Sequence, residues 1–357
     1  MLEPAGHKDV LFVFEHPGPW ARYRCDHQAE QLEFLGGTAD VVQLEHVDLP
    51  TTVDHYDCFV LNRVPWSEEV ATLVDLAHER KRPVLYDTDD LNFDATLERY
   101  FAFLDGWPEE DRRRQAERFA GYRRTLEASD GAIVSTQPLA EQAARVVSRV
   151  GVAHNAVSEE MVGRADEALA AERGRDATTI AYLSGTRTHD RDFLEAADAV
   201  LAALRADRKL RLLIVGKLQL DSRFDRFAKQ VERLPLQPWD SLPRVIRTRV
   251  DVNLAPLERE NLVTDCKSCV KYLEAALVGV PTIASPRPDF RRAIEDGRNG
   301  FLADDATAWH DRLQALIASP ELRRDLGAAA YEDVRRNHTT RVSAPRLRDT
   351  LPVRMTA

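Results

Sequence analysis

The segment from residue 251 to residue 289 constrains the fold more than any other part of the chain. It contains two short apolar runs, DVNLA and PTIAS, which are typical of buried parallel strands, and KYLEAALVG between them has the spacing of a helix. Gly279 ends this helix and Pro281 cannot continue it, so the chain returns to the sheet at a defined point. The segment therefore predicts a βαβ unit, and with it an α/β fold built on a parallel sheet.

The polar loop of residues 258–267 follows the first strand of this unit. Open α/β sheets bind ligands outside the carboxyl ends of their strands, and the next helix points its N-terminus to the same place. Lys267, Ser268 and Lys271 add a hydroxyl and two cations there, and Glu274 stands one turn further along. This set suits a nucleotide, with phosphates near the cations and ribose hydroxyls on the carboxylate. A solvated helix face is the alternative, although the apolar residues after Glu274 argue against it.

The two halves of the chain open in the same way. DVLFVF, residues 9–14, is a buried-strand run that precedes a loop containing Gly18 and then a helix, and TTIAYLSG, residues 178–185, begins a second strand, glycine loop and helix. One loop glycine is not the three-glycine dinucleotide fingerprint, so NAD binding is poorly supported. Two such openings predict two doubly wound domains that face each other.

Three carboxylates, Asp87, Asp89 and Asp90, stand at the carboxyl end of the strand predicted over residues 83–90. Carboxylates at this edge can bind Mg²⁺ or orient sugar hydroxyls. We favour the hydroxyls. An Asp-rich loop that caps the next helix is the alternative.

The βαβ unit resembles the C-terminal signature of the GT-B retaining glycosyltransferases of family four, also called group one glycosyl transferases. That signature, Glu-Ala-x-x-x-Gly-x-Pro-hydrophobic-Ala-Ser, falls here on Glu274, Ala275, Gly279, Pro281, Ala284 and Ser285. In the family the Glu holds the ribose of a nucleotide sugar, and the resemblance implies this role for Glu274. In the family another Glu contacts the transferred sugar, and Cys266 occupies its position here. We expect Asp265 or Lys267 to take over that contact in this chain.

The resemblance extends to the second glycine loop, which in the family reads Gly-Arg-x-x-x-x-Lys-Gly. With Gly185 and Phe193 as fixed points, Arg191 falls in the Lys slot and Thr186 in the Arg slot, while Arg187 is displaced by one position. The resemblance implies that Arg187 and Arg191 neutralise the donor diphosphate, and an arginine fork can bind two of its oxygens at once.

Five further residues are candidate contacts to donor or acceptor. Lys217 follows a strand, and Trp239 lies in the segment that receives the nucleotide base, with ordinary packing as its alternative. Gly18 and Arg22 belong to the first loop and helix, where a solvated helix start is the alternative for Arg22. His189 is a candidate acid, base or sugar contact, with a hydrogen-bonded loop residue as its alternative.

Composition bounds the class of protein. The 357 residues are 44% hydrophobic and 30% charged, which suits two α/β domains with a core each. The net charge of −10 argues against a nucleic-acid-binding chain. No run of eighteen apolar residues and no secretory segment is present, so we expect a cytoplasmic protein without a transmembrane segment, with peripheral membrane contact left open.

The four cysteines, Cys25, Cys58, Cys266 and Cys269, do not form a disulfide framework in a chain of this length. Cys266 and Cys269 form a CxxC, but the two further ligands that structural zinc needs are missing, so no metal site is predicted. A redox CxxC usually opens a helix after the first strand of a small domain, whereas this one lies in a late loop.

The sequence thus predicts the GT-B architecture, with two facing doubly wound parallel-sheet domains and an interdomain cleft. The predicted parts are an acceptor-binding domain at residues 1–157, a linker at 158–177, a nucleotide-sugar-binding domain at 178–335 and a segment at 336–357 that returns to the first domain.

The predicted activity is retaining transfer of a sugar from a nucleotide diphosphate sugar to a glycan, lipid carrier or small metabolite, with no cofactor required. A GT-B nucleotide-sugar epimerase and a catalytically weak nucleotide-binding protein of the same fold are the alternatives. The candidate catalytic residues are Arg187, Arg191, Lys267, Lys271, Asp89 and Asp90. The candidate donor-binding residues are Gly185, Thr186, Lys217, Trp239, Ser268 and Glu274. The candidate acceptor or sugar contacts are Gly18, Arg22, His189, Asp265 and Cys266.

Overall fold

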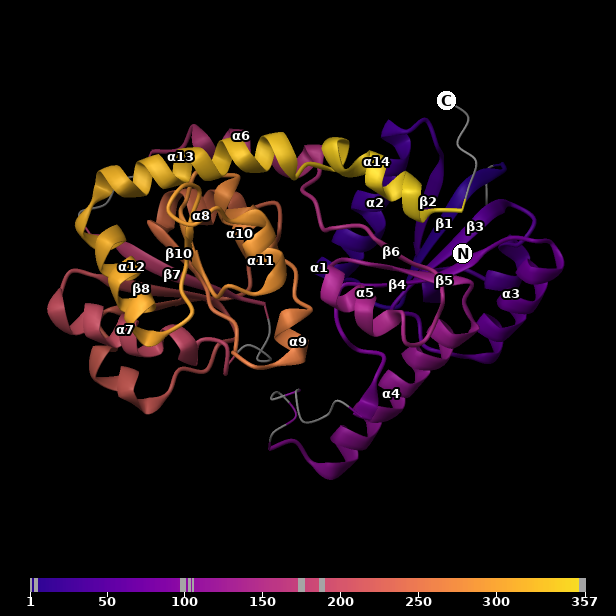
Figure 1. The fold of residues 1–357 in the computed structure, drawn as a ribbon, viewed down its shortest axis with the longest axis horizontal. Coiled ribbons are helices and arrows are strands. Elements are labelled where there is room, and N and C mark those ends of the chain that lie inside the picture. Colours follow the sequence, from indigo (N-terminus) through magenta and orange to yellow (C-terminus); the bar gives the residue numbers. More distant parts are fainter. Residues whose placement is uncertain are drawn as a thin grey trace.

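The computed structural model describes residues 2, 6–96, 101, 104, 106–172, 177–185 and 190–352. These residues form two α/β domains, each built on a six-stranded sheet flanked by helices (Figure 1). The strands in the middle of each sheet are mostly buried, as expected of parallel strands covered on both faces. The predicted α/β fold with two facing parallel-sheet domains is confirmed.

The N-terminal sheet has the strand order β2-β1-β3-β4-β5-β6, and every neighbouring pair is parallel. Its strands are β1 (Lys8–Phe14), β2 (Ala39–Gln43), β3 (Tyr56–Asn62), β4 (Val84–Thr88), β5 (Gly131–Val134) and β6 (Val150–Val152). The helices of this domain are α1 (Pro19–Ala21), α2 (His27–Phe34), α3 (Glu68–Glu79), α4 (Glu109–Ala128) and α5 (Gln137–Ala143).

Short polar residues set the starts of helices at the ligand edge of this sheet. Ser67 accepts a hydrogen bond from the backbone N–H of Val70 at the start of α3, and Thr136 accepts one from Leu139 at the start of α5. A π-helical turn, Arg22–Asp26, joins α1 to α2. This turn carries side chains that meet the other domain.

The C-terminal sheet has the order β12-β11-β10-β7-β8-β9, again with parallel neighbours. Its strands are β7 (Thr179–Ser184), β8 (Arg211–Gly216), β9 (Val231–Leu234), β10 (Val252–Ala255), β11 (Thr282–Ala284) and β12 (Phe301–Leu302). The remaining α-helices are α6 (Glu159–Leu169), α7 (Leu194–Ala206), α8 (Leu242–Arg249), α9 (Leu262–Asp265), α10 (Val270–Ala276), α11 (Pro288–Ala293), α12 (Ala306–Ala318), α13 (Pro320–Asn337) and α14 (Thr340–Thr350).

The predicted turn after α10 takes the left-handed backbone conformation that glycine tolerates. Gly279 has φ +67°, and a Cβ on Gly327 of α13 would lie 2.2 Å from the carbonyl oxygen of Gly279. Two glycines therefore let α13 pack directly on the end of α10, which positions the helix that carries Glu274.

The predicted linker at residues 158–177 begins with α6, which packs on the C-terminal domain through Met161 and Ala165. In the opposite direction, α14 carries Leu347 into the N-terminal core, beside α2 and β6 (Figure 1). The chain therefore crosses between the domains twice, at residues 153–158 and at residues 338–339.

The two crossings, which we call the crossover segments, are hydrogen-bonded to each other. The backbone N–H of Val157 donates to the carbonyl of His338 at 2.9 Å, and the N–H of Thr340 donates to the carbonyl of Val157 at 2.9 Å.

Among the helices of the described ranges, none has the length and apolar character needed to span a membrane.

Candidate functional site

The loop between β10 and α10 reaches from the C-terminal sheet to the N-terminal domain. Asn261 accepts a hydrogen bond from the N–H of Val263 at 2.9 Å, which caps the short helix α9. The Thr264 hydroxyl donates to the carbonyl oxygens of Glu258 and Asn261 at 2.7 and 2.8 Å. These bonds fold the predicted polar loop into a helical turn, which holds the residues that follow it at the domain boundary.

Cys266 ends this turn inside an apolar cluster of the N-terminal domain. The cluster includes Leu91, Phe93 and Leu139, and the Thr136 hydroxyl donates to the Cys266 carbonyl at 2.9 Å. Burial raises the pKa of the Cys266 thiol to about 12, so the thiol is neutral at pH 7. The side chain thus fills an apolar contact between the domains, whereas the sequence predicted a contact with sugar or acceptor.

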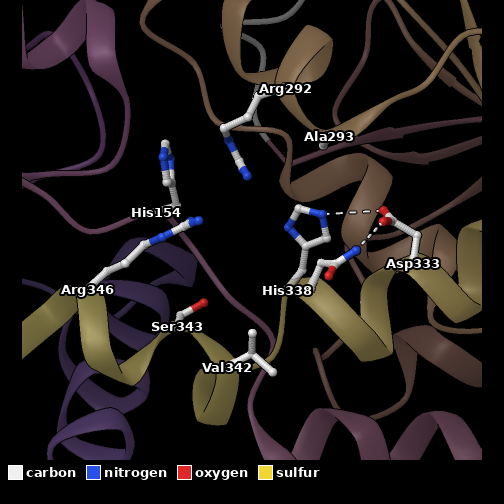
Figure 2. A pocket seen from close by; sticks show the side chains of 9 residues that line it. His154, Arg292, Ala293, Asp333, His338, Val342, Ser343 and Arg346 are labelled. Atoms are coloured by element: carbon white, nitrogen blue, oxygen red, sulfur yellow. Dashed lines mark hydrogen bonds and ion pairs between the residues drawn. The ribbon is translucent and has the colours of Figure 1, made fainter.

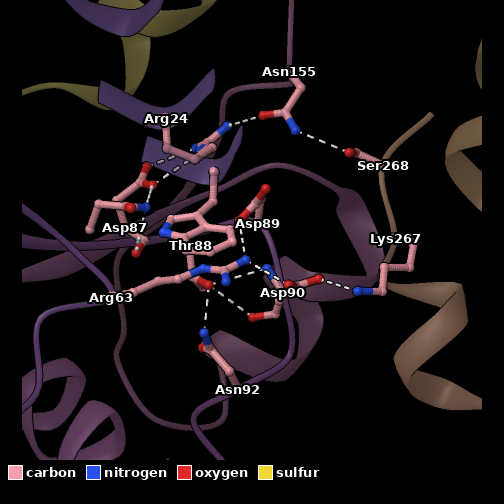
Figure 3. Close-up of polar contacts among 12 residues, drawn as sticks. Arg24, Arg63, Asp87, Thr88, Asp89, Asp90, Asn92, Asn155, Lys267 and Ser268 are labelled. Atoms are coloured by element: carbon pink, nitrogen blue, oxygen red, sulfur yellow. Dashed lines mark hydrogen bonds and ion pairs between the residues drawn. The ribbon is translucent and has the colours of Figure 1, made fainter. Parts of the chain in front are cut away.

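Lys267 belongs to a charged network that crosses the domain boundary (Figure 3). Its ammonium lies 2.5 Å from a carboxylate oxygen of Asp90, and Arg63 donates to Asp89 at 2.5 Å and to the second oxygen of Asp90 at 2.6 Å. Burial alone would raise the pKa of Asp90, but the charges of Lys267 and Arg63 outweigh it and hold the pKa well below its usual range. Asp90 is therefore ionised, and both candidate carboxylates are engaged by cations.

Arg63 was missed by the sequence prediction although it follows the rule that found the aspartates. It comes directly after β3 at the same carboxyl edge, and its guanidinium lies 5.0 Å from the centre of the Trp20 ring. Gly18 makes room for that ring, because a Cβ on Gly18 would meet Trp20 at 2.6 Å. The structure thus shows Gly18 cradling Trp20, and contact of Gly18 with a ligand stays a prediction.

Asp87 lies deeper than the other two carboxylates. Arg24 donates to both of its oxygens at 3.0 and 2.8 Å, and to Asn155 at 3.1 Å (Figure 3). The amide of Asn155 in turn donates to the Ser268 hydroxyl at 3.0 Å. Asn155 therefore links the N-terminal core to the start of α10, a contact that the sequence did not predict.

Glu274 of α10 also contacts the N-terminal domain. The Tyr23 hydroxyl donates to one Glu274 oxygen at 3.2 Å, and the Arg22 guanidinium lies 3.8 Å from the same oxygen. Burial raises the pKa of Glu274, while the charge of Arg22 acts in the opposite direction. The Arg22 guanidinium also lies 4.9 Å from the centre of the Trp239 ring. The predicted residues Arg22, Trp239 and Glu274 are thus brought together.

Lys271 lies on the same helix, one turn before Glu274. Its ammonium lies 5.8 Å from the centre of the Tyr182 ring, and within the described ranges no carboxylate forms an ion pair with it. Burial lowers the pKa of Lys271, while the more distant charges of Asp192 and Glu274 oppose that effect in part. A partly buried cation without a paired carboxylate is suited to bind an anion.

The start of α10 offers less to an anion than the sequence predicted. The helix is seven residues long, and the N–H of Cys269 already donates to the Asp289 carboxylate at 2.8 Å. Side-chain groups of Lys267, Ser268 and Lys271 are therefore the principal donors here.

The second glycine loop is described in part. Gly185 follows β7, and the Arg191 guanidinium lies 3.7 Å from the Glu258 carboxylate. Lys217 follows Gly216, which has φ +100°, and its N–H donates to the Ser184 carbonyl at 3.3 Å. The predicted residues Thr186, Arg187 and His189 lie outside the described residues.

Asp265 is engaged by the C-terminal domain itself, since Arg287 donates to its carboxylate at 3.2 Å. In the ranges that the structure describes, no group of three or more His, Cys, Asp and Glu side chains is arranged to hold a metal ion. The four cysteines are free and buried.

Comparisons with known proteins agree with this geometry. Residues 187–349 match the family model described as "Glycosyl transferase-like". An Anabaena protein, HepE, solved with UDP and glucose, superposes with a TM-score of 0.61 over 96% of this chain and 99% of its own, at 14% sequence identity. The chain has the GT-B fold. The predicted resemblance is confirmed, and its assignment to family four stays a prediction.

Two curated relatives match this GT-B chain over less than half of its length. The D-inositol 3-phosphate glycosyltransferase of Pseudarthrobacter chlorophenolicus is 32% identical over 147 residues, which are 38% of this chain and 33% of that protein. The phosphatidyl-myo-inositol mannosyltransferase of Mycobacterium leprae is 33% identical over 144 residues, 39% of this chain and 37% of that protein. The match thus spans about a third of the length of the curated relatives.

Proposed function

We propose that this GT-B protein is a glycosyltransferase that takes its sugar from a nucleotide diphosphate sugar and transfers it, with retention of configuration, to a hydroxyl of an acceptor. The observation that carries the proposal is Lys271, a partly buried cation that has no paired carboxylate among the described residues, beside Ser268 and one turn before the partly buried Glu274. The glycosyl transferase-like family match covers these residues.

The three side chains bind different parts of the donor. The Lys271 ammonium and the Ser268 hydroxyl bind the diphosphate and stabilise the charge that develops on it as the sugar departs. The Glu274 carboxylate accepts hydrogen bonds from the ribose hydroxyls. Tyr23 and Arg22 of the N-terminal domain contact the same carboxylate. Donor binding therefore replaces a contact between the domains with a contact to the ribose.

The charged network of the N-terminal domain bears on how the acceptor attacks. Asp89 and Asp90 are engaged by Arg63 and Lys267, so neither carboxylate is poised as a nucleophile. Attack on the same face from which the diphosphate departs needs no carboxylate nucleophile, because a diphosphate oxygen accepts the proton of the acceptor. This front-face route through an oxocarbenium-like transition state accounts for the proposed retention.

A thermal-shift panel of UDP, GDP, ADP, dTDP and CDP tests the donor site. UDP is tried first because the Anabaena protein was solved with it. A diphosphate at about 100 times its dissociation constant stabilises the folded protein by about 2.7 kcal/mol, which is visible as a higher melting temperature. Lys271→Gln and Glu274→Ala are expected to lose most of that shift. The control is Lys229→Gln, which changes an exposed lysine just before the edge strand β9, outside the proposed donor site.

The chemistry is tested with the sugar form of the stabilising nucleotide. Release of the nucleoside diphosphate from the nucleotide sugar reports transfer. NMR of the anomeric configuration of the product reports retention. Absence of stabilisation by all five diphosphates argues against the proposal. So does a shift that survives in both the Lys271 and the Glu274 variant.

A further inference from the structure

A polar cavity lies beside the crossover segments, lined by α11, α13, α14 and both crossover segments. Its volume is about 400 Å³, and its lining includes Arg292, Arg346, His154, His338 and Ser343 (Figure 2). None of these residues belongs to the proposed donor site. A volume of this size lies within the range of about 300–1,000 Å³ typical of small-molecule sites.

The cavity joins parts of the chain that belong to different domains. Arg292 lies on α11 and Asp333 on α13, both in the C-terminal domain, whereas Ser343 and Arg346 lie on α14, which packs against the N-terminal core. His154 is part of the first crossover segment and His338 part of the second. A ligand here therefore contacts both domains and both connections between them.

The polar ends of the lining residues converge on a common space. Figure 2 shows the guanidinium groups of Arg292 and Arg346, the Ser343 hydroxyl and the His338 ring turned toward the middle of the cavity. In the described ranges Arg346 has neither a hydrogen bond nor an ion pair. Arg292 donates from Nε to Asp289 at 2.7 Å and from Nη2 to the Cys269 sulfur at 3.7 Å, so among the described residues only its Nη1 has no hydrogen bond.

The acid in the lining is already satisfied by the protein. Asp333 accepts hydrogen bonds from Tyr272 at 3.0 Å and from Asn337 at 2.8 Å, and the Nε2 atom of His338 lies 3.3 Å away. Burial alone would raise the pKa of Asp333, but His338 and these hydrogen bonds outweigh it and lower the pKa to about 2. The Asp333 carboxylate is thus engaged by donors of the protein itself.

We propose that this cavity binds the phosphate monoester of a small polar molecule. The guanidinium fork of Arg346, the Nη1 atom of Arg292 and the Ser343 hydroxyl match the oxygens of a phosphate dianion, which one arginine can bind in a bidentate manner. The cavity is larger than a bare phosphate requires, and Ala293 and Val342 are its apolar lining residues, so the remaining volume suits a polar body such as a sugar. The site is independent of the proposed transferase activity.

Isothermal titration calorimetry with glucose 6-phosphate, inorganic phosphate and glucose tests the site on the full chain. We expect saturable binding of glucose 6-phosphate and none of glucose. Loss of one charge-assisted contact in Arg346→Gln weakens binding about tenfold. Ser343→Asp abolishes binding by charge repulsion. The control is Arg348→Gln, an exposed arginine on the same helix that does not line the cavity and leaves affinity unchanged.

Two further measurements distinguish this cavity from the donor site. Lys271→Gln leaves glucose 6-phosphate binding unchanged if the ligand occupies the crossover cavity. Bound ligand also slows hydrogen exchange at the backbone amides of Val157 and Thr340, which join the crossover segments.

Comparison of the two phosphates identifies the source of the ligand. Tighter binding of glucose 6-phosphate supports a phosphorylated metabolite, and equal binding of inorganic phosphate supports the phosphate group as the recognised part. The proposal is overturned if neither phosphate binds saturably, if Lys271→Gln abolishes binding while Arg346→Gln does not, or if protection from exchange appears elsewhere and not at the crossover.

Discussion

Two carboxylates at the end of β4, Asp87 and Asp90, lie three positions apart but serve different parts of the molecule. Asp87 is fully buried, and its carboxylate takes four hydrogen bonds from side chains of its own domain. The Asp90 side chain is 30% exposed and contacts Lys267 of the other domain as well as Arg63. Asp87 is therefore part of a domain core, and Asp90 is part of the domain boundary.

The difference follows from depth along the strand. Asp87 is still inside β4, paired in register with Asn62 of β3, whereas Asp90 lies two residues beyond the end of the strand. A charge inside the sheet must be neutralised by the domain that contains it, since no water reaches it. A charge beyond the sheet can meet a ligand or another domain. A position at the carboxyl edge of the sheet is thus not enough to assign a function to a carboxylate, because its depth along the strand also matters.

The largest expected effect is on the buried carboxylate. Asp87→Asn is expected to lower the free energy of unfolding by about 3 kcal/mol, because it leaves the buried Arg24 guanidinium without a counter-charge. Urea unfolding measures this loss. Asp89→Asn, which lies beyond the strand, is the control and costs less than about 1 kcal/mol. Equal losses in the two variants would show that depth along β4 does not separate these residues.

The apolar contact between the domains is expected to matter less than the buried charge but more than Asp90. Cys266→Ser places a hydroxyl among Leu91, Phe93 and Leu139, at a cost of about 1–2 kcal/mol. Cys266→Ala keeps the contact apolar and separates the effect of polarity from that of lost volume. If the Cys266→Ser variant is as stable as the Cys266→Ala variant in urea unfolding, water reaches this contact in spite of its burial.

Much of the fold could be predicted because parallel strands are apolar runs between helical segments. The predicted strands at residues 9–14 and 83–90 correspond to β1 and β4. The sequence did not predict β2 and β9, because both are sheet-edge strands with mostly half-buried or exposed residues and lack a continuous apolar run.

The candidate site could be predicted only within each domain. Lys271 and Glu274 stand one turn apart on a helix, so their proximity follows from sequence spacing. The Asp90–Lys267 and Tyr23–Glu274 contacts depend on how the domains are placed, which no local pattern encodes. The burial of Cys266 in the other domain's core has the same origin.

The Asp90 contact sharpens the comparison by separating stability from domain placement. Asp90→Asn is expected to cost only about 0.5–1 kcal/mol of unfolding free energy, because the pair is partly exposed. Small-angle X-ray scattering is expected to show a larger radius of gyration, since Lys267 loses its partner across the boundary. Asp87→Asn at a temperature where it remains folded is the control and leaves the radius unchanged. An unchanged radius in Asp90→Asn would mean that the apolar contact alone holds the domains.

Glu274 is an interdomain carboxylate whose pKa is shifted in the opposite direction to that of Asp90, and it gives the smallest expected effect. Burial raises the pKa of Glu274 above its ordinary value of 4.5. Between the unfolded and the folded pKa, the folded protein therefore keeps a proton on Glu274 that the unfolded protein has released, and stability rises as the pH falls through the folded pKa. Asp90 behaves in the opposite way: its contribution to stability is present above its ordinary pKa of 3.8 and is lost as the pH falls below that value. Glu274→Gln removes the charge but keeps an acceptor for Tyr23, so it is expected to stabilise the protein by less than about 1 kcal/mol at pH 7, with the difference shrinking on acidification. Urea unfolding from pH 7 to pH 4 measures this convergence. If the variant is instead less stable than the wild type at pH 7, attraction between Glu274 and Arg22 outweighs the cost of burying the charge, and Glu274 belongs with Asp90 among the carboxylates that hold the domains together.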